Sequence, residues 1–114
     1  MLNWLKGKPK VEKDPEMPLN VDAAEFMNLD PKACYVLDLR DLATFRQGHI
    51  KGAHQLPYVE LNRRMHELPT NKLIVTVDTS ERRGKQAAKL LKQSGLDARN
   101  LKGGIAGWTG KLVK

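Results

Sequence analysis

Short hydrophobic runs alternate with polar turn residues along most of the chain. Four of these runs are typical of strands, at residues 34–40, 54–57, 72–77 and 98–102. The runs at 34–40 and 72–77 are almost continuously apolar, which favours strands that are buried on both faces of a sheet. The pattern therefore predicts a sheet in the interior of the molecule.

Helical patterns lie between these runs. Asp22 and Glu25 have the spacing of a capping box, and the helix that they begin should end before Asp30-Pro31. Further helices are predicted at 41–48, at 58–68 with Leu61, Met65 and Leu68 on one face, and at 84–93, with a closing turn around Ile105 and Trp108. Strands that alternate with helices predict a parallel α/β sheet with helices on both faces.

The chain of 114 residues suits one domain with a single core. Residues 1–18, rich in charge, Gly and Pro, predict a flexible tail, and residues 19–114 the folded domain. No apolar run approaches the ~20 residues that span a bilayer. The apolar stretch in the first residues is also shorter than the hydrophobic region of a signal peptide, so we expect a cytoplasmic protein.

The net charge of +7 is concentrated in the second half of the chain. Residues 1–60 carry eight basic and nine acidic side chains, whereas residues 61–114 carry twelve and four. A basic half could attract nucleic acid, an acidic protein or an anionic metabolite, or it could simply be a solvated helix face. Because no aromatic residues interleave with Lys85, Lys89 and Lys92, the pattern disfavours nucleic acid.

A candidate binding loop follows the strand at 72–77. Ligands of parallel α/β sheets bind beyond the carboxyl ends of the strands, where both Asp38–Arg40 and Asp78–Arg83 fall. Backbone N–H groups that curve into a helix N-terminus form an anion site, which Asp78 could fill with its own carboxylate as a helix cap. The candidate residues are Asp78, Thr79, Ser80, Glu81, Arg82, Arg83 and Gly84.

Other reactive groups fit known chemistry less well. The three histidines show no metal-ligand spacing, and no Walker loop is present, so neither a metal nor a cofactor is predicted. With one cysteine, Cys34, the chain cannot form an internal disulfide. Cys34 opens a strand expected to be buried, where a thiol is usually inert.

Three stretches of the sequence now resemble the rhodanese homology domain. The first, DLRDLATFRQGHIKGA (38–53), is similar to the family's Asp-x-Arg, its aromatic residue and its Gly-His-Ile-x-Gly-Ala motif. The second is the strand, loop and helix of residues 74–91. The third, LKGGIAGW (101–108), is similar to the terminal Leu-x-Gly-Gly-x-x-x-Trp. The resemblance covers roughly residues 19–108 and implies a small single-domain α/β fold with a mostly parallel five-stranded sheet.

The resemblance also implies a loop chemistry that this chain lacks. Active relatives carry Cys-Arg-x-Gly-x-Arg, and the thiolate accepts sulfane sulfur as a persulfide. The aligned positions here are Asp78 for the cysteine, Thr79 and Arg83 for the arginines, and Glu81 for the glycine. A loop longer by one residue, as in related phosphatases, would place Val77 at the nucleophile position. Glu81 is expected to bring negative charge toward the pocket, which opposes thiosulfate or phosphate.

Two functions follow from the resemblance. The first is an inactive homologue of the sulfurtransferase family, a binding or regulatory module for a protein partner or for a small anion, sulfur-bearing anions included. The alternative is a sulfurtransferase or persulfide carrier that uses Cys34 or a thiol of a partner. In either case, Asp38, Arg40 and His49 are expected mainly to support the fold, and they could hold the site together by binding amides and carboxylates of the loop.

Overall fold

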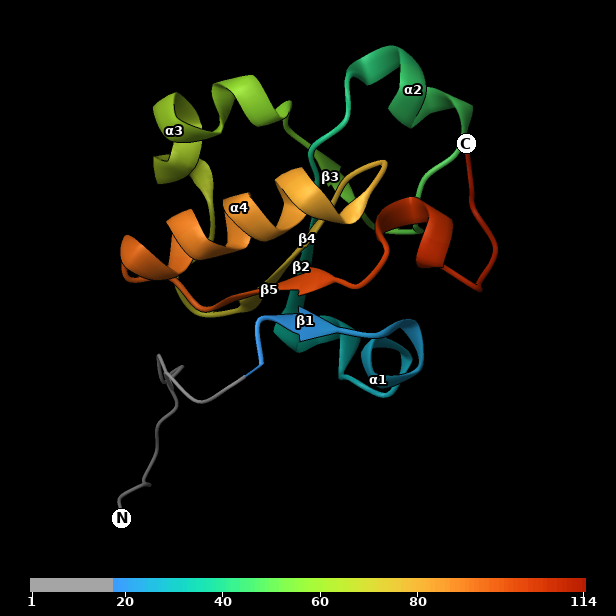
Figure 1. Ribbon diagram of the computed structural model, residues 1–114, viewed down its shortest axis with the longest axis horizontal. Coiled ribbons are helices and arrows are strands. Elements are labelled where there is room, and N and C mark those ends of the chain that lie inside the picture. The colour runs from blue at the N-terminus through green and yellow to red at the C-terminus, as the bar shows by residue number, and fades with distance from the viewer. Residues whose placement is uncertain (1–17) are drawn as a thin grey trace.

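Five parallel strands form the centre of the molecule (Figure 1). The computed structural model describes residues 18–114. The strands are β1 (Asn20–Val21), β2 (Cys34–Asp38), β3 (His54–Gln55), β4 (Leu73–Val77) and β5 (Ala98–Leu101), and their order in the sheet is β1-β5-β4-β2-β3. Every neighbouring pair is parallel, which confirms the predicted α/β fold class and makes the sheet wholly parallel.

The register of the strands brings the candidate loops to one edge of the sheet. Cys34 lies opposite Leu73 at the amino ends of β2 and β4, and Asp38 lies opposite Val77 at their carboxyl ends. The hydrophobic pattern did not indicate β1, because its two residues are too few to show a period. This strand extends the sheet beyond β5, where Asn20 pairs with Asn100.

Within residues 18–114, four α-helices and four 3₁₀ turns accompany the strands. The helices are α1 (Ala23–Met27), α2 (Leu42–Gln47), α3 (Leu61–Arg64) and α4 (Glu81–Gln93), and the turns are η2 (Pro31–Ala33), η3 (Tyr58–Glu60), η4 (Met65–Glu67) and η5 (Gly104–Gly107). The capping box is confirmed, since Asp22 Oδ1 accepts from the Glu25 amide at 2.7 Å. The single helix predicted over 58–68 is wrong: η3, α3 and η4 divide that segment.

The two faces of the sheet are covered by different elements (Figure 1). On one face, α3 and α4 pack side chains such as Leu61 and Leu91 against Leu37 and Ile74. On the other face, α1 and η5 cover a second cluster of valine, leucine and isoleucine side chains. Because both faces of β4 are buried, its sequence is apolar almost throughout, as the pattern predicted.

The predicted tail, residues 1–18, falls almost wholly outside the described part of the chain. Pro18 is described, and its carbonyl accepts a hydrogen bond of 3.0 Å from Arg99 Nε. None of the helices within residues 18–114 has the length and hydrophobicity needed to cross a membrane.

Candidate functional site

The candidate site lies at the carboxyl edge of the sheet, between β4 and α4. Only Asp78, Thr79 and Ser80 form the connecting loop. The helix α4 begins at Glu81, earlier than the predicted start at Gly84. Four of the seven candidate residues, Glu81 to Gly84, therefore lie in the first turn of a helix, where the side chains of Glu81, Arg82 and Arg83 point in different directions.

The carboxylate of Asp78 is buried at the end of β4, with 1% of the residue exposed. Its Oδ1 accepts from the Thr79 amide at 2.6 Å and from Arg83 Nη2 at 3.1 Å. Its Oδ2 lies 3.0 Å from Arg83 Nε, an ion-pair distance, although the contact lacks the alignment of a hydrogen bond. The charge of Asp78 is thus balanced by Arg83, which lies in the first turn of α4.

The prediction that Asp78 caps α4 is wrong. The N-cap residue is Ser80, and no side-chain capping bond forms at this position of the described chain. Asp78 stands two residues before the N-cap, so its carboxylate reaches the Thr79 amide instead of the amides of the first helical turn. The amides at the start of α4 consequently have no side-chain cap from Ser80 or Asp78.

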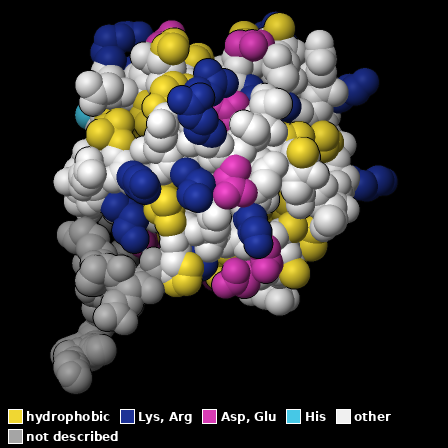
Figure 2. Space-filling model, viewed as in Figure 1, with side chains coloured by type: hydrophobic (Ala, Val, Ile, Leu, Met, Phe, Trp, Pro, Cys, Tyr) yellow, Lys and Arg dark blue, Asp and Glu magenta, His cyan; other side chains and the backbone are white. Residues whose placement is uncertain are grey.

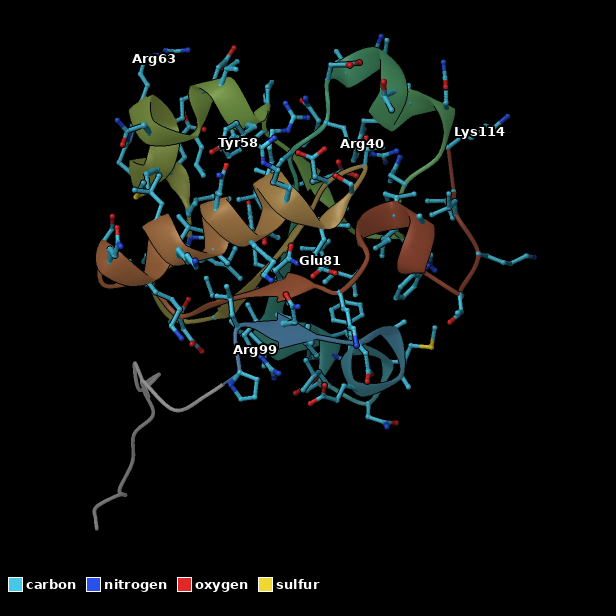
Figure 3. All side chains as sticks on the ribbon, in the orientation of Figure 1. Arg40, Tyr58, Arg63, Glu81, Arg99 and Lys114 are labelled. Carbon is cyan, nitrogen blue, oxygen red and sulfur yellow. The ribbon has the colours of Figure 1, made fainter. Side chains whose placement is uncertain are left out.

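Glu81 is turned away from the loop, between α4 and β5 (Figure 3). Its Oε1 accepts from the Gly103 amide at 2.7 Å, and its Oε2 accepts from Asn20 Nδ2 at 3.2 Å. The hydrogen bond from Gly103 is the main reason that the pKa of Glu81 lies below its usual value. The expectation that Glu81 opposes an anion in the pocket is wrong, because its carboxylate binds the turn after β5.

Two arginines give the outer side of the loop positive charge. The side chain of Arg83 is 49% exposed, and its guanidinium carbon lies 5.4 Å from the ring centroid of Tyr58. The hydroxyl of Tyr58 donates to Gln86 Oε1 at 3.0 Å, which fixes the ring beside α4. Arg82, Thr79 and Ser80 are exposed. The loop therefore shows solvent a cationic surface above a buried carboxylate.

The turn at Gly103-Gly104 closes the other side of the loop. Ile105 donates its amide to the Asp78 carbonyl at 2.8 Å. A Cβ at Gly104 would meet the Asp78 carbonyl oxygen at 2.5 Å, and the φ of this residue is +65°. A glycine is required here because the turn packs directly on the loop backbone.

A chain of polar side chains that sequence reasoning missed connects the sheet with α4. Thr76 Oγ1 donates to the Gly84 carbonyl at 2.8 Å and lies 3.3 Å from Asn100 Oδ1. Asn100 Nδ2 donates to Asn20 Oδ1 at 3.0 Å, and Asn20 in turn donates to Glu81. Both Thr76 and Asn100 are fully buried. The only signal in the sequence is polar residues inside otherwise apolar strands: Thr76 in β4, and Asn100 beside Arg99 in β5.

Asp38, Arg40 and His49 support the fold, and the hydrogen bonds of their side chains lie within residues 38–49 and not on the loop itself. Arg40 makes two side-chain bonds to Asp38, at 2.9 and 2.8 Å, and a third to the Gly48 carbonyl at 2.8 Å. His49 Nδ1 lies 2.8 Å from the Phe45 carbonyl oxygen, and its ring stacks on Phe45. All three residues fix the segment from β2 through α2, because Nε and Nη2 of Arg40 are bound by Asp38 and Gly48 and the His49 ring lies on Phe45.

Cys34 lies at the amino ends of the strands, whereas the loop lies at their carboxyl ends. It opens β2 and pairs with Leu73, five residues before Asp78, so roughly 16 Å of strand separates the two sites. The residue is only partly buried, unlike the expectation. Burial raises the pKa of its thiol, and the carboxylates of Asp30 and Asp97 raise the pKa further.

The basic side chains do not form one continuous patch on the face shown in Figure 2, where they alternate with acidic and hydrophobic side chains. On α3, Arg64 is paired with both Glu60 and Glu67 at 2.9 Å. These pairs reduce the local excess of charge that the sequence indicated. Within residues 18–114, no three His, Cys, Asp or Glu side chains gather in a group able to hold a metal ion.

Comparison with known proteins gives several relatives. The chain is 35% identical over 78 residues to the uncharacterized protein YqhL of Bacillus subtilis, covering 68% of this chain and 62% of that protein. It is 33% identical over 92 residues to the putative sulfur carrier protein YrkF of Bacillus subtilis, covering 80% of this chain and 46% of that protein. The chain thus spans about half to three fifths of the length of these two relatives.

A third relative and a solved structure match over more of their length. A sulfurtransferase from Allochromatium vinosum is 36% identical over 80 residues, which cover 69% of this chain and 75% of that protein. A rhodanese-related protein from Thermoplasma volcanium superimposes with a TM-score of 0.77 at 27% identity, covering 82% of this chain and 96% of the other. Residues 22–111 match the rhodanese-like domain, and the chain belongs to that family.

Proposed function

We propose that this chain is a non-catalytic rhodanese-like domain, a binding or regulatory module for a protein partner or a small anion. One observation supports the proposal: Asp78, which the resemblance assigns to the position of the sulfur-carrying cysteine, is a buried carboxylate at the end of β4. A carboxylate cannot take up sulfane sulfur as a thiolate does. The thiol of Cys34 lies at the other edge of the sheet.

The exposed arginines define what the loop would bind. Arg82 is exposed and Arg83 is half exposed, whereas the one carboxylate between them and the sheet is buried and paired. The loop therefore offers positive charge and the amides at the start of α4, an arrangement that favours anions. We expect the partner to be a small anion or an acidic protein surface.

A sulfurtransferase assay tests the absence of catalysis. Wild type should form no thiocyanate from thiosulfate and cyanide above the rate without protein, and Cys34→Ser should behave identically. Turnover by wild type that is lost in Cys34→Ser would overturn the proposal. Asp78→Cys and Asp78→Cys with Glu81→Gly test whether the remaining loop can activate a thiol; the single variant is needed because Glu81 also holds Gly103.

Anion binding is tested by NMR titration with thiosulfate and, separately, with phosphate. The amides of Thr79, Ser80 and Arg82 should shift, and the shifts should shrink as sodium chloride is raised, because surface charges are screened. Arg82→Gln should weaken the effect, whereas Arg63→Gln on α3 serves as the matched control. Equal shifts in both variants would place the anion elsewhere on the protein.

A second function, sulfur transfer through Cys34 or a thiol of a partner, is supported by the names of two relatives. One is a sulfurtransferase, and the other is a putative sulfur carrier protein. These names favour this function over the first. Against it stand the raised pKa of Cys34, which lowers the amount of thiolate, and the distance of Cys34 from the loop.

Mass spectrometry separates the two functions. After incubation with thiosulfate or with a persulfide donor, a carrier should gain the mass of one sulfur atom on Cys34. A gain that cyanide removes would support the second function and contradict the first. An unchanged mass, together with no turnover in the assay above, would leave binding as the function.

A further inference from the structure

The second face of the sheet is covered less completely than the first. The helix α4 has 13 residues, whereas α1 has five and η5 has four. A cavity of about 520 Å³ remains between α1, the amino end of β2, the segment 50–52 and Trp108. This volume lies in the ~300–1,000 Å³ range of small-molecule sites.

The walls of the cavity are mainly hydrophobic. Phe26 and Trp108 line the cavity and pack edge to face with their ring centroids 5.6 Å apart, and Leu29 and Ile50 also line it. Met27, which also lines the cavity, is 50% exposed. Apolar surface is thus left in contact with water, and an apolar ligand would remove it from water.

The charge of the lining has one sign. Its two charged side chains within the described chain are Lys51 and Lys111, both exposed. They come from two segments that are joined where the His49 and Val113 amides each donate to the other's carbonyl at 2.8 Å. The carboxylates of Asp30 and Asp97 act instead on Cys34, which also lines the cavity. An anionic ligand in the cavity would therefore have two lining cations to pair with, Lys51 and Lys111.

We propose that this cavity binds a small amphipathic anion, a linear aliphatic carboxylate. Its carboxylate pairs with Lys51 and Lys111, and its hydrocarbon chain lies against Phe26 and Trp108 and reaches Cys34. The site shares no lining residue with the loop from Asp78 to Gly84, so it is independent of the function proposed for that loop.

The rate of alkylation of Cys34 tests the proposal, because this is the only cysteine of the chain. Dodecanoate, kept below its micelle concentration, should slow the reaction with N-ethylmaleimide at least ten-fold. Dodecyltrimethylammonium, with the same tail and the opposite charge, should slow it less than two-fold. In NMR spectra, dodecanoate should also shift the Trp108 indole and Lys51 amide signals. Absent protection, or equal protection by both probes, would overturn the proposal.

Charge reversal tests the lysines. Lys51→Glu with Lys111→Glu should weaken dodecanoate binding at least ten-fold, and both residues are exposed, so the fold should persist. Lys89→Glu with Lys92→Glu on α4 makes the same change of net charge on the other face and should leave binding within two-fold. Equal weakening in both pairs would overturn the proposal. The first residues of the chain include the apolar Trp4 and Leu5, which could compete for the cavity. If replacing both by Ser speeds the alkylation of Cys34 in the absence of dodecanoate, the chain's own first residues occupy the cavity, and the proposal is overturned.

Discussion

Buried polar residues determine how closely α4 can approach the sheet. Asn100 is fully buried, and its amide reaches Asn20 while its carbonyl oxygen faces Thr76. Gly84 lies directly over this group, and a Cβ at that position would overlap Asn100 Oδ1. The absence of a side chain at Gly84 is therefore a packing requirement, since its position within a helix gives it no other advantage.

We predict that Gly84→Ala destabilises the protein by roughly 1–3 kcal/mol, the usual cost of overpacking a buried site. The better helix propensity of alanine offsets at most ~1 kcal/mol of this cost. Urea unfolding followed by circular dichroism measures the change. Lys89→Ala, exposed on the same helix, should stay within ~0.5 kcal/mol of wild type. A stabilised Gly84→Ala would mean that the Asn100 side chain moves freely.

Cys34 gives a prediction about pH. Burial and two carboxylates raise the pKa of its thiol, so the folded chain holds the proton more tightly than the unfolded chain. The contribution of this thiol to the free energy of unfolding is fully present below its ordinary pKa. It is lost as the pH rises through the pKa of Cys34 in the folded protein. Alkylation by iodoacetamide should therefore reach half its maximal rate at a higher pH in the folded protein than in urea. Coinciding midpoints would contradict the shift.

At the scale of elements, the loop after β4 is held by the turn after β5. The amides of Ile105 and Gly103 both donate from this turn, to the Asp78 carbonyl and to the Glu81 carboxylate. These hydrogen bonds from the turn after β5 therefore hold in place the loop that carries the cationic surface. The segment from β2 to α2, with Asp38 and Arg40, stabilises itself separately.

We predict that Gly104→Ala destabilises the protein by about 2 kcal/mol or more. Its φ of +65° disfavours any side chain, and the new Cβ would also press on Asp78 and Ser80. Gly52→Ala, which has a φ of +83° but open space around the Cβ, is the control for backbone strain alone. Thermal unfolding should show a clearly larger loss for Gly104→Ala, and equal losses would exclude the packing contribution.

At the scale of the whole molecule, the sequence predicted most of the fold but only part of the site. Long apolar runs identified β2 and β4 because both faces of these strands are buried. The two-residue strand β1 gave no periodic signal. The direction of Glu81 depends on Gly103, 22 residues away, and no local pattern reports such a contact. Arg40 was assigned to the loop because spacing alone does not show that Asp38 already occupies its guanidinium.

The sheet order predicts a gradient of protection from hydrogen exchange. β4 lies at the centre, between β5 and β2, and is buried on both faces, whereas β1 and β3 lie at the edges. Amides of Val75 and Val77 should therefore exchange among the slowest in the protein, through near-global unfolding. Exchange followed by NMR should show faster rates in β1 and β3. Comparable rates at centre and edge would contradict this order.

The shortness of β1 and β3 also affects how copies of the protein behave together. Each edge strand has only two residues, so neither offers a long row of free amides and carbonyls as a template for another chain. A wholly parallel sheet of buried, β-branched strands would otherwise be an aggregation hazard. Concentrated solutions should accordingly resist the edge-to-edge pairing that leads to fibrils.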